Sequence, residues 1–422
     1  MARLESIQYR TSYARIELDS IHWVTSKEVS ISDLPALFWI TCMPWREANS
    51  WFREQVLING KDSKTALSNA NALQHYATWL ESEKLDWKYF PLRKDDRCLL
   101  KYRGHLIKER DAGNIAPSTA TARMNHVIRF YRWVKKTGLI SPNLELWTDI
   151  TVAIRTHTSV GFERTLQIQS CDLSIPNAGK RGTTLEDGVF PVSAVDRELI
   201  LDIAEMHCPP ELYYMLLLGF HTGMRVQTIC DLKIKNITMA TRHPVRDKTF
   251  LIAVGPTASP PVRTKYQISG LIEIPEQLLN TLTTYANCIR RAKREIFAKQ
   301  EHKDLLFLTS RGNSYARRGT ETSPAINVAM NDLRKQGLSR GVAVMQGFSF
   351  HRSRATFATE YTKVALSINP KHALSMVKNA MLHKNESTTL AYIKFVENTP
   401  IKEAASNKFT QEFLGRYYGN AA

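Results

Sequence analysis

The sequence predicts a mainly α-helical protein with a small antiparallel β-sheet. Apolar residues recur at helical spacing over several long stretches, whereas only residues 248–255 and 270–275 read as convincing strands. These two strands are expected to pair in a small antiparallel sheet with a loose connection. The chain has 422 residues, of which 43% are hydrophobic and 23% are charged, and this composition is typical of a globular protein with two or three domains.

The first part of the chain divides into an extension and a helical domain. Residues 1–60 are interpreted as an N-terminal extension, to which no function is assigned. Residues 61–147 are expected to form a compact helical domain, with helices at 63–82, 97–113 and 117–136. The third helix has the clearest pattern, an apolar stripe along one face made by Met124, Val127, Ile128, Tyr131 and Val134.

A linker is expected to separate this helical domain from a second one. Residues 148–190 are predicted to be irregular, because Gly, Pro, Asn and Ser are frequent in their last part. The second domain spans residues 191–400 and opens with a helix that Ser193 is suited to cap. A strongly apolar helix at 210–223 is expected to be buried, and residues 401–422 form a C-terminal tail.

The charge of the chain favours a polyanionic partner, most simply nucleic acid. The net charge is +17, and residues 93–136 alone hold 12 Lys or Arg against four Asp or Glu. The face of the third helix opposite its apolar stripe carries the candidate DNA-binding residues Arg123, Arg129, Arg132, Lys135 and Lys136. This face is interpreted either as a solvated charged surface or as a helix laid on a phosphate backbone, which the excess of one sign favours.

Several classes of protein are disfavoured by what the sequence lacks. The six cysteines include no CxxC pair, so neither a metal centre nor a disulfide framework is expected. No run of about 18 apolar residues predicts a membrane span, and the first residues have no apolar signal-peptide core. No P-loop is present, and no cofactor is expected. The protein is therefore expected to be soluble and cytoplasmic.

Three stretches of the second domain carry residues suited to phosphate chemistry. "HTGMRVQTICDL" places Arg225 directly after the apolar helix. "FSFHRSRATFATEY" places His351 and Arg354 three residues apart, on one helix face. "MLHKNESTTLAYIKF" places His383 nine residues before Tyr392. Taken one at a time, each residue has an ordinary structural interpretation, such as a core histidine or a packed aromatic ring.

Together, the order and internal spacing of these stretches resemble the tyrosine recombinase (phage integrase) family. The resemblance covers roughly residues 61–400 and implies a helical core-binding domain followed by a tyrosine-recombinase catalytic domain. It implies that Arg225, His351, Arg354 and His383 surround a scissile phosphate and that Tyr392 attacks it. It also implies a lysine in the turn between two strands, for which Lys265 is the candidate and Arg263 the rival.

The sequence departs from the family pattern at three places. Thr228 stands where the family has an acid three residues after its first arginine, and Asp231 is the nearest acid. Leu382 stands where the third motif has a glycine, and the two residues inside "HRSR" differ from the usual pair. These changes concern residues that support the catalytic groups, and they indicate a divergent branch.

The resemblance implies strand exchange through a 3′-phosphotyrosyl intermediate, without metal or ATP. The expected partners are double-stranded DNA at specific recombination sites, a homo-tetramer on that DNA, and an accessory DNA-bending or directionality factor. The tail 401–422 resembles a segment that docks on a neighbouring protomer, the alternative being a helix folded back on its own chain. A mobile-element or phage integrase, associated with a prokaryotic nucleoid, is the expected setting.

Two other functions remain open from the sequence. One is a catalytically silent protein that uses a recombinase-like domain only to bind DNA. The other is a related topoisomerase or telomere resolvase, which would keep the chemistry and change the product.

Overall fold

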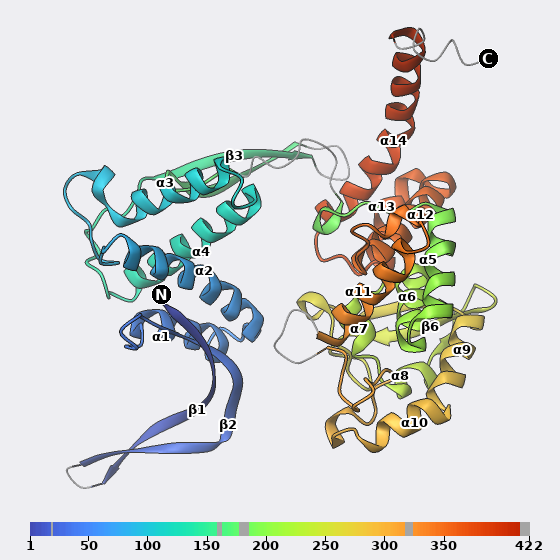
Figure 1. The fold of residues 1–422 in the computed structure, drawn as a ribbon, viewed down its shortest axis with the longest axis horizontal. Coiled ribbons are helices and arrows are strands. Elements are labelled where there is room, and N and C mark those ends of the chain that lie inside the picture. Colours follow the sequence, from blue (N-terminus) through green and yellow to red (C-terminus); the bar gives the residue numbers. More distant parts are fainter. Residues whose placement is uncertain (18–19, 158–162, 177–184, 317–323, 414–422) are drawn as a thin grey trace. The chain divides into compact units, whose positions relative to one another are not determined.

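The computed structural model describes residues 1–17, 20–157, 163–176, 185–316 and 324–413. These residues form two compact units, one built from the described residues up to 176 and the other from residue 185 onward (Figure 1). Both units are mainly helical and their strands pair in small antiparallel sheets, which confirms the predicted fold class. No helix within these ranges is long and apolar enough to cross a membrane.

The first unit combines helices with two antiparallel hairpins (Figure 1). Its elements are β1 (Arg3–Glu17), β2 (Ser20–Phe38), α1 (Arg46–Leu57), α2 (Ser63–Ser82), η1 (Lys94–Asp96), α3 (Cys98–Asp111), α4 (Pro117–Lys136), β3 (Asp149–His157) and β4 (Glu163–Cys171). The predicted helices correspond to α2, α3 and α4. The apolar stripe of α4 is buried along its whole length, because it faces the core that α1, α2 and α3 complete.

Part of the N-terminal extension, residues 1–60, packs on the helical domain. The end of β2 and helix α1 contribute Leu37, Trp45, Trp51 and Phe52 to the same hydrophobic core as α2 and α4. The Trp45 ring lies 5.3 Å from the Phe130 ring of α4, centroid to centroid, in an edge-on arrangement. Trp45, Trp51 and Phe52 therefore complete the helical core, whereas Trp23 is exposed.

The predicted irregular linker at 148–190 is wrong over much of its length. Strands β3 and β4 pair antiparallel from Asp149 opposite Cys171 to His157 opposite Glu163. The Gly, Pro, Asn and Ser residues that suggested an irregular segment follow β4 and mostly lie outside the described residues, so they carried no information about the hairpin.

The second unit surrounds a three-stranded sheet with helices (Figure 1). Its elements are η2 (Glu186–Gly188), α5 (Ala194–His207), α6 (Pro210–Thr222), α7 (Val226–Cys230), α8 (Ile234–Thr238), β5 (Thr241–Arg242), β6 (Thr249–Val254), η3 (Lys265–Gln267), β7 (Gly270–Pro275), α9 (Glu276–Ala286), α10 (Ile289–Ile296), η4 (Gln300–His302), α11 (Pro324–Leu338), η5 (Ala343–Met345), α12 (His351–Ile368), α13 (Pro370–Ala380) and α14 (Glu386–Phe413). The sheet order is β5-β6-β7, and β6 and β7 are the two predicted strands. Ser193 caps α5 as expected, since its side chain accepts a hydrogen bond from the Asp196 amide.

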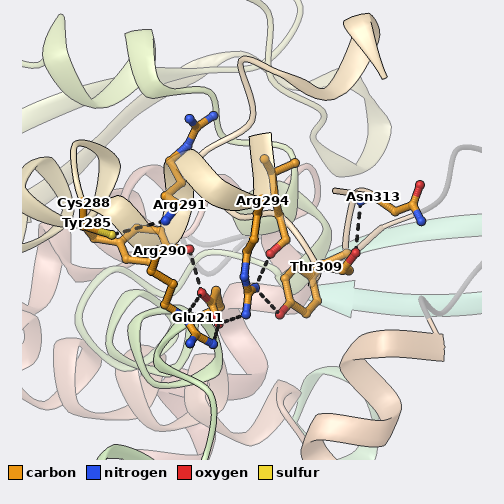
Figure 2. A network of polar contacts seen from close by, with 10 residues as sticks. Glu211, Tyr285, Cys288, Arg290, Arg291, Arg294, Thr309 and Asn313 are labelled. Carbon is orange, nitrogen blue, oxygen red and sulfur yellow. Dashed lines mark hydrogen bonds and ion pairs between the residues drawn. The ribbon is translucent and has the colours of Figure 1, made fainter. Parts of the chain in front are cut away.

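Helix α6 is buried, as its apolar sequence predicted, and a charged network holds its first turn. Glu211 is fully buried, and it accepts hydrogen bonds from the Tyr285 hydroxyl at 3.0 Å and from Arg290 Nε at 2.8 Å (Figure 2). Arg294 adds an ion pair at 3.1 Å. A buried carboxylate is costly unless its oxygens are paired, and this one is paired by groups from α9 and α10. The network therefore ties the start of α6 to α9 and α10.

Candidate active site

The end of α6 aims the first candidate arginine. Gly223 has φ of 66°, the left-handed conformation that commonly ends a helix, and a side chain there would overlap Phe357 of α12. Arg225 follows as the residue that precedes α7, in an extended conformation. This sharp turn directs the Arg225 side chain away from the apolar surroundings of α6, and 17% of the side chain is exposed.

Helix α12 supplies the second arginine. Arg354 is only 3% exposed, and each of its three side-chain nitrogens has a partner. Nη1 donates to the carbonyl of Gly223, Nη2 donates to the carbonyl of Met381 at 2.9 Å, and Nε contacts Glu186. These bonds tie together the ends of α6 and α13, so Arg354 is both an organiser of the site and its most buried cation.

Glu186, in the turn η2, is the centre of the site. Its Oε1 lies 2.6 Å from Arg225 Nη2, and its Oε2 lies 3.1 Å from Arg354 Nε. Its Oε2 also lies 3.4 Å from His383 Nε2. Burial raises the pKa of this carboxyl, but the contact with His383 and the charges of Arg354 and Arg225 outweigh burial and hold the pKa far below its ordinary value. Glu186 is therefore an ionised carboxylate.

His383 is buried and held by two polar partners. Its Nδ1 lies 2.9 Å from the Thr389 hydroxyl, opposite the Nε2 that faces Glu186. Burial lowers the pKa of His383, and the charges of Arg354 and Arg225 lower it further, although Glu186 opposes them. A neutral ring that accepts at Nδ1 from Thr389 carries its proton on Nε2, which lies 3.4 Å from the carboxylate without forming a hydrogen bond of good geometry.

Tyr392 lies on α14 within this cluster. The residue is fully buried, and its ring stacks on the His383 ring with centroids 5.9 Å apart and an angle of 17° between the planes. It also packs in an apolar cluster that includes Leu185 and Met381. Burial and the charge of Arg225 lower the pKa of Arg354, whereas Glu186 and then Tyr392 raise it. The Tyr392 phenol therefore interacts electrostatically with the Arg354 guanidinium.

A cavity of about 340 Å³ opens beside these residues. Its lining includes Glu186, Arg225, Lys265, His383 and Lys384. Lys265 begins η3, and the Nζ atoms of Lys265 and Lys384 lie 5.5 Å and 5.2 Å from the centroid of the Tyr266 ring. Arg263 is not among the described lining residues, and its backbone amide donates to Asp231 at 2.7 Å. Of these two candidates, Lys265 is therefore the one that lines the cavity.

The sixth predicted residue, His351, lies at the edge of the group. It is the first residue of α12, one turn before Arg354, and it is half-buried. It does not line the cavity described above. The structure thus brings Arg225, Arg354, His383 and Tyr392 together, with Lys265 at the cavity. His351 lies at the start of α12, one turn before Arg354.

Sequence reasoning missed Glu186, Thr389 as a partner of His383, and Lys384. A signal for the acid was present, because Thr228 leaves the first arginine without the acid that the family pattern provides. Asp231 does not fill that role, since its carboxylate contacts Lys233 at 2.8 Å and the Arg263 amide. Thr228 itself is buried beside Arg225 and Arg354.

The candidate DNA-binding residues lie on the solvent side of α4 in the first unit. Arg129, Arg132 and Lys136 are exposed, while Arg123 and Lys135 are half-buried. Lys135 Nζ donates to the carbonyl of Leu144 at 3.2 Å. Arg132 lies 3.6 Å from Asp149 and over the Trp147 ring. Arg132, Lys135 and Lys136 line a surface cavity of about 360 Å³.

Two further features concern possible metal ligands and the C-terminal tail. Within the described ranges, no group of three or more His, Cys, Asp or Glu side chains could hold a metal ion. Helix α14 continues into the predicted tail as far as Phe413, and residues 414–422 lie outside the described residues. The expected protomer contact of residues 401–422 therefore stays a prediction.

Comparison with known structures agrees with an integrase-type fold. The Tn1549 transposon integrase in complex with transposon right end DNA matches with a TM-score of 0.50 and 14% identity, over 85% of this chain and 98% of that chain. The same integrase in complex with a circular intermediate DNA matches with a TM-score of 0.50 and 15% identity, over 82% and 93% of the two chains. No curated protein matches the sequence.

The family match concerns the second unit alone. Residues 196–398 match the phage integrase family, so this part of the chain is a phage integrase domain. The resemblance seen in the sequence motifs is thereby confirmed.

Proposed function

We propose that the protein is a site-specific DNA recombinase that cuts and rejoins DNA strands through a 3′-phosphotyrosyl intermediate. One observation carries this proposal: Arg225, Arg354 and His383 converge on a single carboxylate beside Tyr392. A phosphodiester, like a carboxylate, is a monoanion with two oxygens that accept hydrogen bonds. Two guanidiniums and an imidazole N–H form a suitable receptor for it.

In the proposed cleavage step, the Tyr392 oxygen attacks the scissile phosphorus. A bond forms between that oxygen and phosphorus, and the bond from phosphorus to the 5′-oxygen of the leaving strand breaks. The phenol loses its proton to a nearby acceptor, and Lys265 donates a proton to the leaving 5′-oxygen. Rejoining runs the same step in reverse with another 5′-hydroxyl, so neither ATP nor a metal is consumed.

The two histidines take different roles in this proposal. His383 Nε2 lies 3.4 Å from the carboxylate and has no hydrogen-bond partner in the described structure, which supports His383 as a hydrogen-bond donor to a non-bridging phosphate oxygen. His351, one helical turn from Arg354, is left as the acceptor that relays the phenol proton. The arginines stabilise the negative charge that builds up on the phosphate oxygens, and loss of one such donor typically costs about 10²–10³ in rate.

The proposal includes the assembly around this site. Helix α4 of the first unit would contact the phosphate backbone of double-stranded DNA through its exposed arginines and lysines. Exchange between two duplexes needs four strand cuts, hence four protomers on the DNA, with the tail 401–422 as the contact between neighbours. A DNA-bending or directionality factor and a prokaryotic, nucleoid-associated setting belong to the same proposal.

The test is covalent capture of the protein on DNA. Nicked duplexes covering the DNA that flanks the gene would trap a phosphotyrosyl adduct. Cleavage near the nick releases a short fragment with a free 5′-hydroxyl, which diffuses away, so the strand cannot be rejoined. We expect an adduct with the unmodified protein, no detectable adduct with Tyr392→Phe, and an unchanged adduct with the control Tyr361→Phe, whose ring stacks on Phe357 of the same helix.

Adducts that persist in Tyr392→Phe would contradict the assignment of the nucleophile. Salt-dependent DNA binding without an adduct from any variant would instead favour a catalytically silent DNA-binding protein. Recombinant products, as opposed to relaxed circles or hairpin ends, would separate a recombinase from a topoisomerase or a telomere resolvase.

A further inference from the structure

We infer that Glu186 is an internal mimic of the phosphate, which occupies the anion site of the enzyme and must leave before DNA can be cut. This inference rests on the proposed function, since it takes Arg225, Arg354 and His383 as the groups that hold the scissile phosphate. The contact would make the DNA-free site self-inhibited.

The first reason is that Glu186 uses the donors that a phosphate would need. Its two oxygens take Arg225 Nη2 at 2.6 Å, Arg354 Nε at 3.1 Å and His383 Nε2 at 3.4 Å. Nη1 and Nη2 of Arg354 each donate one N–H to a carbonyl, of Gly223 and of Met381, and the single N–H of Nε is directed to Glu186. A phosphate oxygen can therefore reach Arg354 Nε only by replacing the carboxylate.

The second reason is charge. Glu186 is an ionised carboxylate held between two guanidiniums, and only 8% of its side chain is exposed. Two anions in contact in such a site disfavour each other strongly, as two carboxylates that share one site do. A phosphodiester and Glu186 thus compete for the same cations and do not bind side by side.

The third reason is the direction from which Glu186 reaches the cations. An acid that merely supports an arginine would bind it from behind, away from the open space. Glu186 instead lines the cavity itself, together with Arg225, Lys265 and His383. It therefore stands on the side from which a DNA phosphate would enter.

The fourth reason is the segment that carries Glu186. It begins η2, a single turn of three residues that ends at Gly188 with φ of 71°. Leu185, just before it, is buried in the apolar cluster that holds Tyr392. Val189, just after the turn, also packs against that cluster. A short turn between two apolar contacts can withdraw without unfolding a helix, and its movement would change the packing around Tyr392. The device is a latch formed by Leu185 and Glu186.

The experiment measures whether removing the latch opens the anion site. Inorganic phosphate is titrated by calorimetry into the full chain as unmodified protein, Glu186→Gln, Glu186→Asp and the control Glu360→Gln. The control removes one charge from an exposed position of α12. Circular dichroism and thermal melting establish that each variant is folded. If Glu186→Gln does not fold, Glu186→Asp still tests the inference.

We expect Glu186→Gln to bind phosphate at least about tenfold tighter, since a site occupied by its own ligand loses affinity in proportion to that occupancy. Glu186→Asp keeps the charge but is one methylene shorter, so we expect a smaller gain. Glu360→Gln should match the unmodified protein, and adding Arg225→Ala to Glu186→Gln should abolish the gain.

Unchanged or weaker phosphate binding in Glu186→Gln would overturn the latch and assign Glu186 a supporting role. A gain in Glu186→Gln without any gain in Glu186→Asp would also overturn it, because charge alone would then explain the effect. The covalent adduct assay reports separately on the proposed function. Tighter phosphate binding without an adduct from any variant would leave the latch standing and refute the recombinase.

Discussion

Glu186 concentrates the electrostatics of the site in one side chain. Arg225 and Arg354 both contact it in surroundings that exclude most of the water. Removing the carboxylate charge leaves two guanidiniums close together without a counter-ion, a situation that is costly in a buried region. The same contact that blocks a phosphate is thus expected to stabilise the protein while DNA is absent.

This stabilisation should depend on pH in a defined direction. The pKa of Glu186 is depressed in the folded protein, so its contribution is full above the ordinary value of 4.5 and is lost as the pH falls below it. We expect Glu186→Gln to lower the free energy of unfolding by about 1.5–3 kcal/mol at pH 7 and by less at pH 3. Denaturant unfolding at the two pH values measures this difference, with Glu360→Gln as the control, and a difference that does not change with pH would refute the linkage.

At the scale of elements, the site depends on how closely α6 and α12 approach. Gly219 of α6 faces Ser353 of α12, the residue before Arg354. A side chain at Gly219 would overlap the Ser353 hydroxyl, which donates to the carbonyl of Phe350 at 2.8 Å. Because Ser353 is fully buried, it has little room to move, and the approach of the two helices requires a glycine here.

Substituting Gly219 therefore tests whether this approach positions Arg354. Gly219→Ala is expected to destabilise the second unit by about 1–3 kcal/mol, the usual effect of overpacking, and to slow adduct formation. Gly104→Ala is the matched control, since nothing lies within 4 Å of the added methyl group in α3 and alanine should stabilise that helix by about 0.5–1 kcal/mol. Thermal melting and the adduct assay measure both effects. Equal outcomes for the two variants would contradict the packing argument.

The elements also differ in how well they could be predicted from the sequence. Helices α2 and α4 coincide with the predicted 63–82 and 117–136, because one face of each is buried and leaves a helical apolar period. The β1–β2 hairpin was missed, since β1 is mostly exposed and therefore shows no burial-driven alternation. A strand that does not pack against a hydrophobic core therefore shows little hydrophobic periodicity in its sequence.

The residues of the candidate site differ in the same way, because some lie in recognisable sequence motifs and others are brought to the site only by the tertiary structure. Arg225, Arg354, His383 and Tyr392 were predicted as one group because they lie in motifs with defined internal spacing, and the structure brings them close together. Glu186 was missed because it is brought to them from a segment about 40 residues before Arg225, and no local pattern connects the two. Lys265 was predicted from its place in the turn between two strands, with Arg263 as the rival. Of the two, only Lys265 lines the described cavity.

At the scale of the whole molecule, the excess of positive charge is divided between two uses. The arginines of the second unit are partly neutralised, as Glu186 and Glu211 illustrate. On α4 of the first unit, Arg129 and Lys136 are exposed, whereas Lys135 is engaged by the carbonyl of Leu144. Exposed cations are the ones that exchange condensed counter-ions for DNA phosphates, so the residues of α4 should not contribute equally.

The salt dependence of DNA binding distinguishes these residues. Removing one cation that binds a phosphate should reduce the slope of log K against log salt by about 0.9, so Arg129→Ala combined with Lys136→Ala is expected to reduce it by about 1.8. Lys135→Ala should change it less than either single substitution, and Lys61→Ala, an exposed lysine before α2, controls for the removal of one positive charge. Fluorescence anisotropy of a labelled duplex of arbitrary sequence, titrated at several salt concentrations, measures the slopes. An equal effect from Lys61 and from the α4 residues would show that charge alone acts, and would remove α4 from the DNA-binding surface.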